Sequence, residues 1–482
     1  MSLKSLSTLL LVISLFSCSQ DSKENEVLQK PNVIYILADD LGYGDVGCYG
    51  QDFIKTPNID KLAADGMLFT DHYAGSSVCA PSRASLMTGK HTGHSYVRGN
   101  YEKGPLGFGA CLELRDQDFT LGELLKQADY QTSIIGKWGL GMDATTGEPI
   151  KQGFDYSYGY LNQGHAHNQF PEYLFENGNR VSVVANEEGK MGAFSNDIFT
   201  GKALDYLDDK RAESPFFLYM AYTTPHAELV LPNSESFENY AKTVEDKAFV
   251  NGNGASENDG NRWAYRSTET PLAAYAAQIS HLDSCVGVLV NRIKELGIED
   301  NTIIMFSSDN GPHREGGANP KYFKSAGEFR GVKRDLYEGG IRVPFIVKWP
   351  AKVEKGSVSE HTSAFWDLMP TLADIANQDI ESEESDGVSF LPTLTNGTQK
   401  EHDYLYWEFH ENPSSDQAVR KGKWKAIRHD YKGEAELYDL EKDRGEMNNV
   451  AAENPEIVKQ MTLLLDNTRT PSEIWPLKSK KQ

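Results

Sequence analysis

Carboxylate, amide, lysine and histidine side chains follow several apolar runs that are typical of buried strands. Each of these runs ends in a different polar group, namely Asp39-Asp40, Lys137, His226 and Asp309-Asn310. In an open parallel sheet the carboxyl ends of the strands meet at one edge, where ligands bind. Oxygen-rich clusters of this kind suit a hard cation such as Ca²⁺ or Mg²⁺ rather than zinc. An Asp-Asn-Gly sequence alone is more often a turn, but the coincidence at several strand ends indicates one shared site.

Cys79 lies just before a predicted helix start at Pro81 and Ser82. The N-terminus of a helix favours anions, because its first backbone N–H groups have no partner within the helix. The position alone is also compatible with an ordinary cysteine of low pKa. The residue types therefore predict a nucleophile close to an anion site, and leave open whether the thiol itself reacts.

The segment Cys79-Ala80-Pro81-Ser82-Arg83 is similar to the Cys-x-Pro-Ser-Arg signature of the type I sulfatases, and the resemblance extends from Pro31 to about Val450. It implies a sulfuric ester hydrolase in which a maturation enzyme oxidises Cys79 to formylglycine during export. One Ca²⁺ would be bound by Asp39, Asp40, Cys79, Asp309 and Asn310. The implied catalytic residues are Cys79, Arg83, Lys137, His226, Asp309 and Lys333.

The resemblance also implies how these residues act. The hydrated aldehyde attacks sulfur with help from Asp309, while both lysines, Arg83 and the cation stabilise the developing charge. His226 protonates the departing sugar oxygen. Many members read Gly-Lys-Trp-His, but Gly139 stands at the last of these positions. Either another base acts there, for which His91, His94 and His313 are candidates, or the role is shared.

Two further segments, 158–171 and 406–411, are rich in polar and aromatic residues. They look like subgroups of bacterial sulfatases that act on sulfated glycans, including galactose- and N-acetylgalactosamine-type sugars and algal polysaccharides. Aromatic and histidine side chains stack on and hydrogen-bond sugar rings. We expect substrate contacts from His94, Arg98, His167 and His410, although a packing role for each histidine stays open.

The positioning elements are expected to be apolar strands that alternate with helices. This pattern predicts an α/β fold with a mainly parallel sheet and helices on both faces, and the resemblance implies the alkaline-phosphatase-like version of it. The predicted strands are 32–38, 131–135, 216–221, 302–306 and 343–347, and the predicted helices are 119–128, 198–207, 272–296 and 364–376. Short strands at 405–409, 424–428 and 436–439, with a helix at 455–465, predict a small C-terminal antiparallel sheet.

The N-terminal residues resemble a bacterial lipoprotein signal, with Lys4, an apolar run too short to span a bilayer, and Ser17-Cys18. The expected organisation is a signal peptide at 1–17, a lipid-anchor linker at 18–30, a catalytic domain at 31–400 and a C-terminal subdomain at 401–482. Lipidation of Cys18 would anchor the exported protein to a membrane of the cell envelope. The formal net charge of −22 argues against nucleic acid as a partner.

The other cysteines are Cys48, Cys111 and Cys285, and their spacing contains neither a C-x-x-C pair nor a typical zinc pattern. One disulfide is compatible with an exported protein, and Cys285 is expected in the core. Two alternative functions remain. One is a phosphatase or phosphonate monoesterase of the same fold, and the other is a glycan-binding lipoprotein without catalysis.

Overall fold

The computed structural model describes residues 30–100, 112–209, 214–251, 265–381 and 384–480. The predicted signal peptide, the lipidation of Cys18 and most of the linker lie outside these residues, as does Cys111. Within them, three cysteines are free, namely Cys48, Cys79 and Cys285. None of the helices in the described ranges is both long and apolar enough to cross a membrane.

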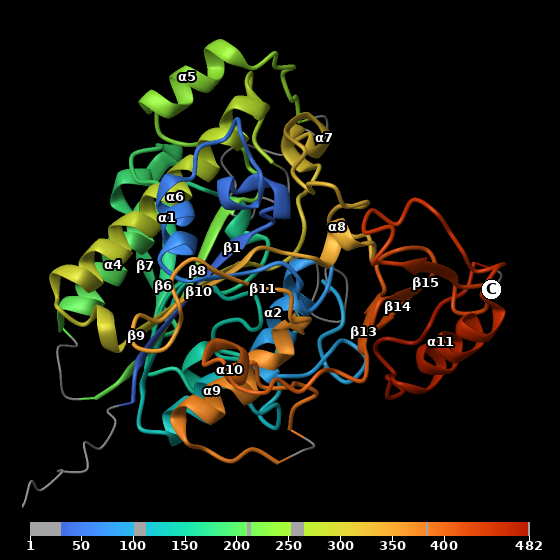
Figure 1. The fold of residues 1–482 in the computed structure, drawn as a ribbon. Coiled ribbons are helices and arrows are strands. Elements are labelled where there is room, and N and C mark those ends of the chain that lie inside the picture. Colours follow the sequence, from blue (N-terminus) through green and yellow to red (C-terminus); the bar gives the residue numbers. More distant parts are fainter. Residues whose placement is uncertain (1–29, 101–111, 210–213, 252–264, 382–383, 481–482) are drawn as a thin grey trace, which may run out of the picture.

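A ten-stranded sheet forms the centre of the molecule, with the order β11-β2-β10-β9-β1-β8-β4-β5-β6-β7 (Figure 1). Its middle is parallel, as predicted, because β9, β1, β8, β4 and β5 all run in one direction. The strand predicted at 343–347 pairs antiparallel with β9. The bounds are β1 Asn32–Asp39, β2 Met67–Phe69, β4 Gln131–Lys137, β5 Tyr156–Tyr160, β6 Tyr173–Glu176, β7 Asn179–Ser182, β8 Phe216–Pro225, β9 Thr302–Ser308, β10 Phe345–Lys348 and β11 Ser357–Ser359.

Helices cover both faces of this sheet, and β1 shows why. Ile34 and Ile36 pack into one hydrophobic cluster, while Val33, Tyr35 and Leu37 pack into another on the opposite face. The first face is covered by α1 Pro57–Ala64, α4 Ser195–Asp209, α5 Glu235–Thr243 and α6 Pro271–Glu295. The second is covered by α2 Cys79–Thr88, α3 Leu121–Gln127 and α9 Leu368–Ala376, and the short helices are α7 Pro320–Phe323, α8 Glu338–Ile341 and α10 Leu391–Leu394.

Helix α3 begins with a capping box. The Thr120 hydroxyl accepts a hydrogen bond from the Glu123 N–H at 3.2 Å, and the Glu123 carboxylate accepts one from the Thr120 N–H at 2.9 Å. This reciprocal capping box satisfies two N–H groups that the helix itself leaves without partners. The cap lies at the start of α3, the helix that precedes β4, the strand that presents Lys137.

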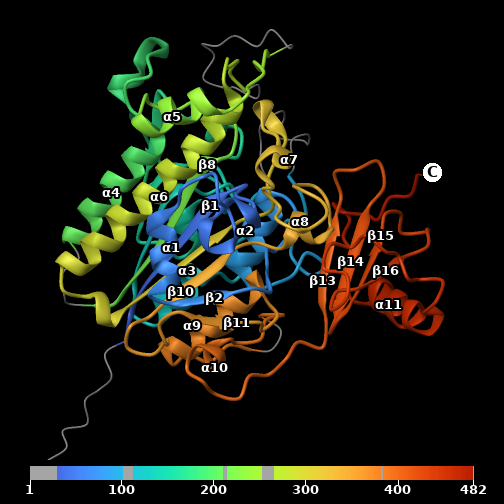
Figure 2. The same ribbon diagram turned by 45° about the horizontal axis from the view of Figure 1, so that its top comes forward.

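The C-terminal part forms a separate four-stranded antiparallel sheet with one helix, as Figure 2 shows to one side of the large sheet. Its strands are β13 Leu405–Phe409, β14 Asp416–Lys421, β15 Trp424–Arg428 and β16 Glu436–Asp439, and its helix is α11 Pro455–Asn467. Met461 and Leu465 of α11 pack against Val419 and Ala426 of the sheet. The small sheet is therefore confirmed, β14 was not predicted, and the boundary at residue 400 stays a prediction.

A buried ionic network joins the C-terminal sheet to α8 and to β3 His72–Tyr73. Lys425 of β15 donates to Glu338 at 2.8 Å and lies 2.9 Å from Glu446. Glu338 also accepts hydrogen bonds from Tyr73 at 2.6 Å and from Arg342 at 2.9 Å. Tyr73 belongs to β3, which pairs with β12 Ser363–Ala364. Charges this deep in the protein depend on one another, so loss of one member leaves its partner buried without compensation.

We expect Lys425→Met to lower the free energy of unfolding by about 3–5 kcal/mol, because two buried carboxylates lose their shared cation. Chemical unfolding measures this. The matched control is Lys423→Met. Lys423 lies just before β15, is more exposed than Lys425 and pairs with Asp439 at 3.0 Å. That change should cost less than about 1 kcal/mol. Equal losses in the two variants would contradict a network that holds the C-terminal sheet against α8.

Candidate active site

The polar residues that follow the strands do meet at one edge of the sheet. Asp39 ends β1, Lys137 ends β4, His226 follows β8, and Asp309 follows β9. These four strands are immediate neighbours in the order β9-β1-β8-β4 and run in the same direction. The edge predicted from the sequence is therefore present, and the side chains on it are all buried.

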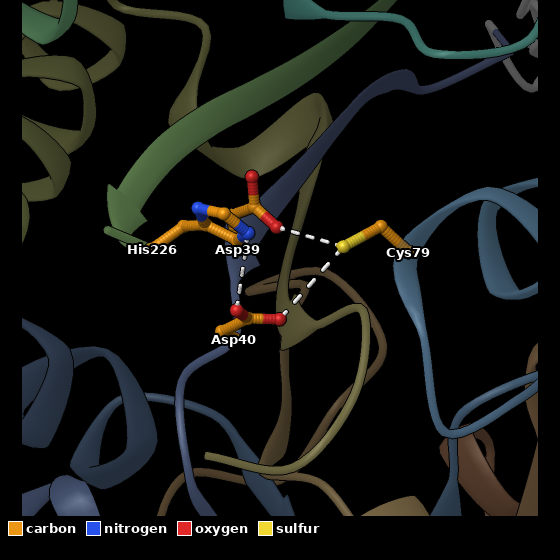
Figure 3. A group of neighbouring side chains, drawn as sticks. All are labelled: Asp39, Asp40, Cys79 and His226. Atoms are coloured by element: carbon orange, nitrogen blue, oxygen red, sulfur yellow. Dashed lines mark hydrogen bonds and ion pairs between the residues drawn. The ribbon is translucent and has the colours of Figure 1, made fainter. Parts of the chain in front are cut away.

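Cys79 reaches this edge from the N-terminus of α2. Its Sγ lies 3.4 Å from Asp39 Oδ1 and 3.8 Å from Asp40 Oδ1, and His226 Nε2 lies 3.4 Å from Asp40 Oδ2 (Figure 3). The helix begins at Cys79 itself, two residues before the predicted start at Pro81. Residue 79 therefore occupies the first turn, where the N–H groups of the helix favour negative charge.

Three buried cations surround the carboxylates. Lys137 Nζ donates to Asp39 Oδ2 at 2.7 Å, and Lys333 Nζ donates to Asp40 Oδ2 at 2.6 Å. Arg83 Nε donates to Asp309 Oδ2 at 3.0 Å, and its Nη1 donates to the Lys137 carbonyl at 2.6 Å. Lys333 comes from the loop before α8, far from Lys137 in the sequence. The two lysines thus come from separate segments and pair with the two aspartates beside Cys79, so an anionic group bound there would meet both cations.

The oxygen atoms of this cluster fit a hard cation. Asn310 donates its amide N–H to Asp40 Oδ1 at 2.7 Å, which leaves Asn310 Oδ1 buried with no hydrogen-bond partner in the described part of the chain. Burial, followed by repulsion from Asp39, raises the pKa of Asp309 to about 7. A divalent ion would relieve both problems, because it binds carboxylate and amide oxygens. Asp39, Asp40, Asp309 and Asn310 are the residues that could hold it.

The surroundings of the Cys79 thiol disfavour its ionised form. Burial raises its pKa well above the ordinary value, and Asp309 and Asp39 raise it further, against the opposing effect of Lys137 and Lys333. Reactive cysteines have lowered pKa values, because the thiolate is the nucleophile. These surroundings disfavour the thiolate and suit an oxygen nucleophile beside a cation better than a thiol of low pKa.

Two glycines shape the segment around Lys137. Gly136 has φ +117°, and a Cβ there would lie 1.9 Å from the Ala221 carbonyl oxygen of the neighbouring strand. Gly139 has φ +78°, and a Cβ there would lie 2.1 Å from Gln163 Nε2. The space beside residue 139 is thus taken by Gln163, whose amide lies 3.3 Å from the Gly139 carbonyl. A side chain at position 139 would therefore be strained by the positive φ and would clash with Gln163.

Aromatic rings line the His226 side of the site. His167 stacks on His226 with centroids 4.8 Å apart, and Tyr265 lies 5.1 Å from His167. His313 stacks on the same histidine at 5.7 Å, and its Nε2 lies 2.9 Å from the Pro225 carbonyl. Of the three candidate bases, His313 is thus the one found beside His226. The sequence did not single out Tyr265 or Gln163, because neither belongs to a motif.

The remaining candidate residues lie elsewhere. His91 and His94 follow the C-terminal end of α2, a helix that begins at Cys79 and is about 15 Å long, and His94 Nδ1 lies 2.8 Å from Asp386. Arg98 and His410 are both buried against Glu408, at 2.8 and 2.9 Å. Of the four predicted substrate contacts, the structure brings only His167 beside the Cys79 cluster. His94, Arg98 and His410 lie outside the cluster, and their contact with substrate stays a prediction.

Comparison with known proteins yields consistent matches over most of the chain. The sulfatase family profile matches residues 31–378, and that of the C-terminal part of N-sulphoglucosamine sulphohydrolase matches residues 327–470. An N-acetylgalactosamine-6-O-sulfatase of Bacteroides thetaiotaomicron is 29% identical over 95% of this chain and 97% of its own. Human arylsulfatase A is 31% identical over 91% and 88%. The crystal structure of Ps i-CgsB in complex with k-i-k-neocarrahexaose superposes with a TM-score of 0.74 at 30% identity, over 91% and 93%.

Proposed function

Because this chain belongs to the sulfatase family and is a sulfuric ester hydrolase, we propose that it releases sulfate from a sulfated glycan, with residue 79 converted to formylglycine. The observation that carries the proposal is the position of Cys79. It lies at a helix N-terminus, 3.4 Å from a carboxylate that is itself paired with Lys137. A formylglycine at this position supplies a hydrated aldehyde, whose hydroxyl is a nucleophile that a thiol of raised pKa does not provide.

The residues around position 79 then have separate tasks. Lys137 and Lys333 bind the oxygens of the sulfate group and hold its sulfur in front of residue 79. Arg83 holds Asp309 and the Lys137 carbonyl in place, at 3.0 and 2.6 Å. Preorganised cations of this kind act strongly in a water-poor site, because they need no reorganisation as charge develops.

His226 is the residue that gives a proton to the departing sugar oxygen. Burial lowers the pKa of His226 well below its usual value, and Lys333 and Lys137 lower it further, against the opposing effect of Asp39. An anionic sulfate ester between the two lysines would offset their repulsion and raise the pKa of this histidine again. Binding of substrate would thus favour the protonated form that the leaving group needs.

Calcium is the cation that we propose for the four oxygen ligands. Exhaustive chelation with EGTA is expected to lower the rate by about 100-fold or more, because charge stabilisation by a bound metal is worth several kcal/mol. The melting temperature should fall as well, since three buried carboxylates lose a compensating charge. Metal analysis before and after treatment is the control, and Ca²⁺ should restore both properties. Unchanged rate and melting temperature in metal-free protein would contradict the calcium site.

The substrate is proposed to be a sulfated sugar. Among the predicted sugar contacts, His167 has the strongest structural support. The named relatives include an enzyme for N-acetylgalactosamine 6-sulfate and a structure with a bound neocarrahexaose. His167 stacks beside the proton donor His226 and is only partly buried. An imidazole there can hydrogen-bond or stack on the sugar that leaves.

Sulfate release from glycosaminoglycan and carrageenan fragments tests the function directly. Aryl sulfate and aryl phosphate are assayed beside them, with protein produced together with a formylglycine-generating maturation enzyme. We expect sulfate release from at least one glycan and slower turnover of phosphate. Faster turnover of phosphate would favour the phosphatase alternative, and binding of sulfated glycans without any release would favour the non-catalytic one.

Export and anchoring rest on the sequence alone. We propose that cleavage before Cys18 and lipidation of its thiol attach the protein to a membrane of the cell envelope. Detergent-dependent extraction of the wild-type protein, and its loss in Cys18→Ala, would support this placement. A soluble wild-type protein after export would contradict it.

A further inference from the structure

A second cluster of metal-binding side chains lies on the helices that cover the sheet, outside the Cys79 cluster. Asp197 belongs to the first turn of α4, and His281 and Cys285 lie four residues apart on α6. Figures 1 and 2 both show α4 and α6 side by side. One ligand atom from each of the three side chains lies within 4.8 Å of the other two. Residues four apart on a helix share one face, so α6 presents both groups toward α4.

We propose that Asp197, His281 and Cys285 form a binding site for a zinc ion that joins helices α4 and α6. The donor set is a carboxylate, an imidazole and a thiolate, which suits zinc and differs from the oxygen-rich Cys79 cluster. Three protein ligands leave a fourth tetrahedral position for water.

One side of the cluster is buried in the core and the other is open to solvent. Cys285 is 5% exposed and belongs to the hydrophobic cluster beneath α6. The side chains of His281 and Asp197 are 22% and 53% exposed, so an ion and its water ligand can enter from solvent. The ring of Phe194 packs edge-on against His281 at 5.2 Å and restrains its orientation. Ligands restrained in this way lose little freedom when they bind a metal.

The cluster already stabilises a positive charge. His281 Nε2 lies 2.7 Å from Asp197 Oδ1. Burial lowers the pKa of His281, but hydrogen bonds with Asp197 and Cys285 raise it to about 10. A proton on the imidazole therefore compensates the cluster at neutral pH. A zinc ion would replace this proton and the thiol proton, and both protons leave to solvent.

The other peripheral group, His91, His94 and Asp386, is less suited to a metal. The Gly93 N–H donates to His91 Nδ1 at 3.1 Å, so the proton of the neutral ring lies on Nε2, the atom that faces Asp386. His91 then has no free lone pair for a metal on that side. A catalytic Cys-His-Asp triad at Cys285 is also less suited, because Cys285 packs into the core and leaves little room for a substrate.

The zinc site would lie behind the strand end that presents His226. Asn196, next to Asp197, accepts a hydrogen bond from Thr223 at 2.9 Å and donates one to Thr224 at 2.5 Å. Thr223 and Thr224 lie three and two residues before His226 in the sequence. An ion at Asp197 would therefore restrain the first turn of α4, which holds the end of β8.

Titration of the full chain with Zn²⁺ and Co²⁺, in the presence of saturating Ca²⁺, tests the proposal. We expect one bound ion, a rise in melting temperature, and a thiolate-to-metal charge-transfer band with Co²⁺. Cys285→Ser and Asp197→Asn should each weaken binding by more than the roughly 10–100-fold that loss of an outer-shell partner costs. The second variant changes an exposed side chain, so it stays informative if the first folds poorly.

Two controls separate this site from other thiols. Cys48→Ser should leave binding unchanged, and Cys79→Ala should retain the charge-transfer band, because neither residue belongs to the cluster. Absence of binding to the wild-type chain would overturn the proposal. So would a band that persists in Cys285→Ser or disappears in Cys79→Ala.

Discussion

Replacement of Cys79 with alanine is expected to lower sulfate release by about 10⁴-fold or more, the scale seen when a nucleophile is removed from a hydrolase. The physical reason is that no other described side chain takes its place at the N-terminus of α2 and beside Asp39 and Asp40. The fold should be kept, because alanine fits the first turn of a helix. Initial rates on a glycan substrate and on an aryl sulfate measure the effect.

Cys79→Ser and Cys48→Ser make the comparison specific. A serine that stays unmodified keeps a hydroxyl beside the cation site but cannot form the aldehyde, so it should release sulfate far more slowly than the wild type. Cys48 is the matched thiol, since it is free and lies outside the cluster. Its replacement should leave the rate within a few-fold. Mass spectrometry of the peptide with residue 79 decides the chemistry, and a fully active protein with an unmodified thiol would contradict formylglycine.

The part of this site that follows strands β1, β4, β8 and β9 could be predicted from the sequence. Each strand is a continuous apolar run with a polar group directly after it, so both the strand and its end are local features. Helix α2 begins two residues before the start that Pro81 and Ser82 predict, because proline is tolerated in the first helical turn. The sulfatase resemblance supplied Lys333, which no local pattern connects to the strand ends.

Contacts between distant segments could not be predicted in this way. Gln163 fills the space beside Gly139, and His167 stacks on His226, only because the segment after β5 folds back over the strand ends. The cluster of His281 with Asp197 joins residues 84 apart and has no spacing motif. The strand β14 was missed because five of its six residues are buried, including polar ones, and no alternation marks it.

Replacement of His226 with alanine is expected to lower sulfate release from a glycan by about 10²–10⁴-fold, the usual contribution of a general acid. A sugar alkoxide is a poor leaving group and needs the proton, whereas a nitrophenolate leaves readily without it. The same variant should therefore lose much less activity on a nitrophenyl sulfate. The ratio of the two losses is the measurement, taken from kcat on each substrate.

This ratio separates proton donation from the structural contacts of His226. The imidazole stacks with both His167 and His313 and lies 3.4 Å from Asp40, so its removal could also disturb the lysines and the cation ligands. Such a disturbance would lower both rates by similar factors, because both substrates carry the same sulfate group. His313→Gln is the matched variant, since it changes another ring that stacks on His226 and leaves the proton donor in place. Equal losses on both substrates in His226→Ala would assign this histidine a positioning role and leave the proton to another residue.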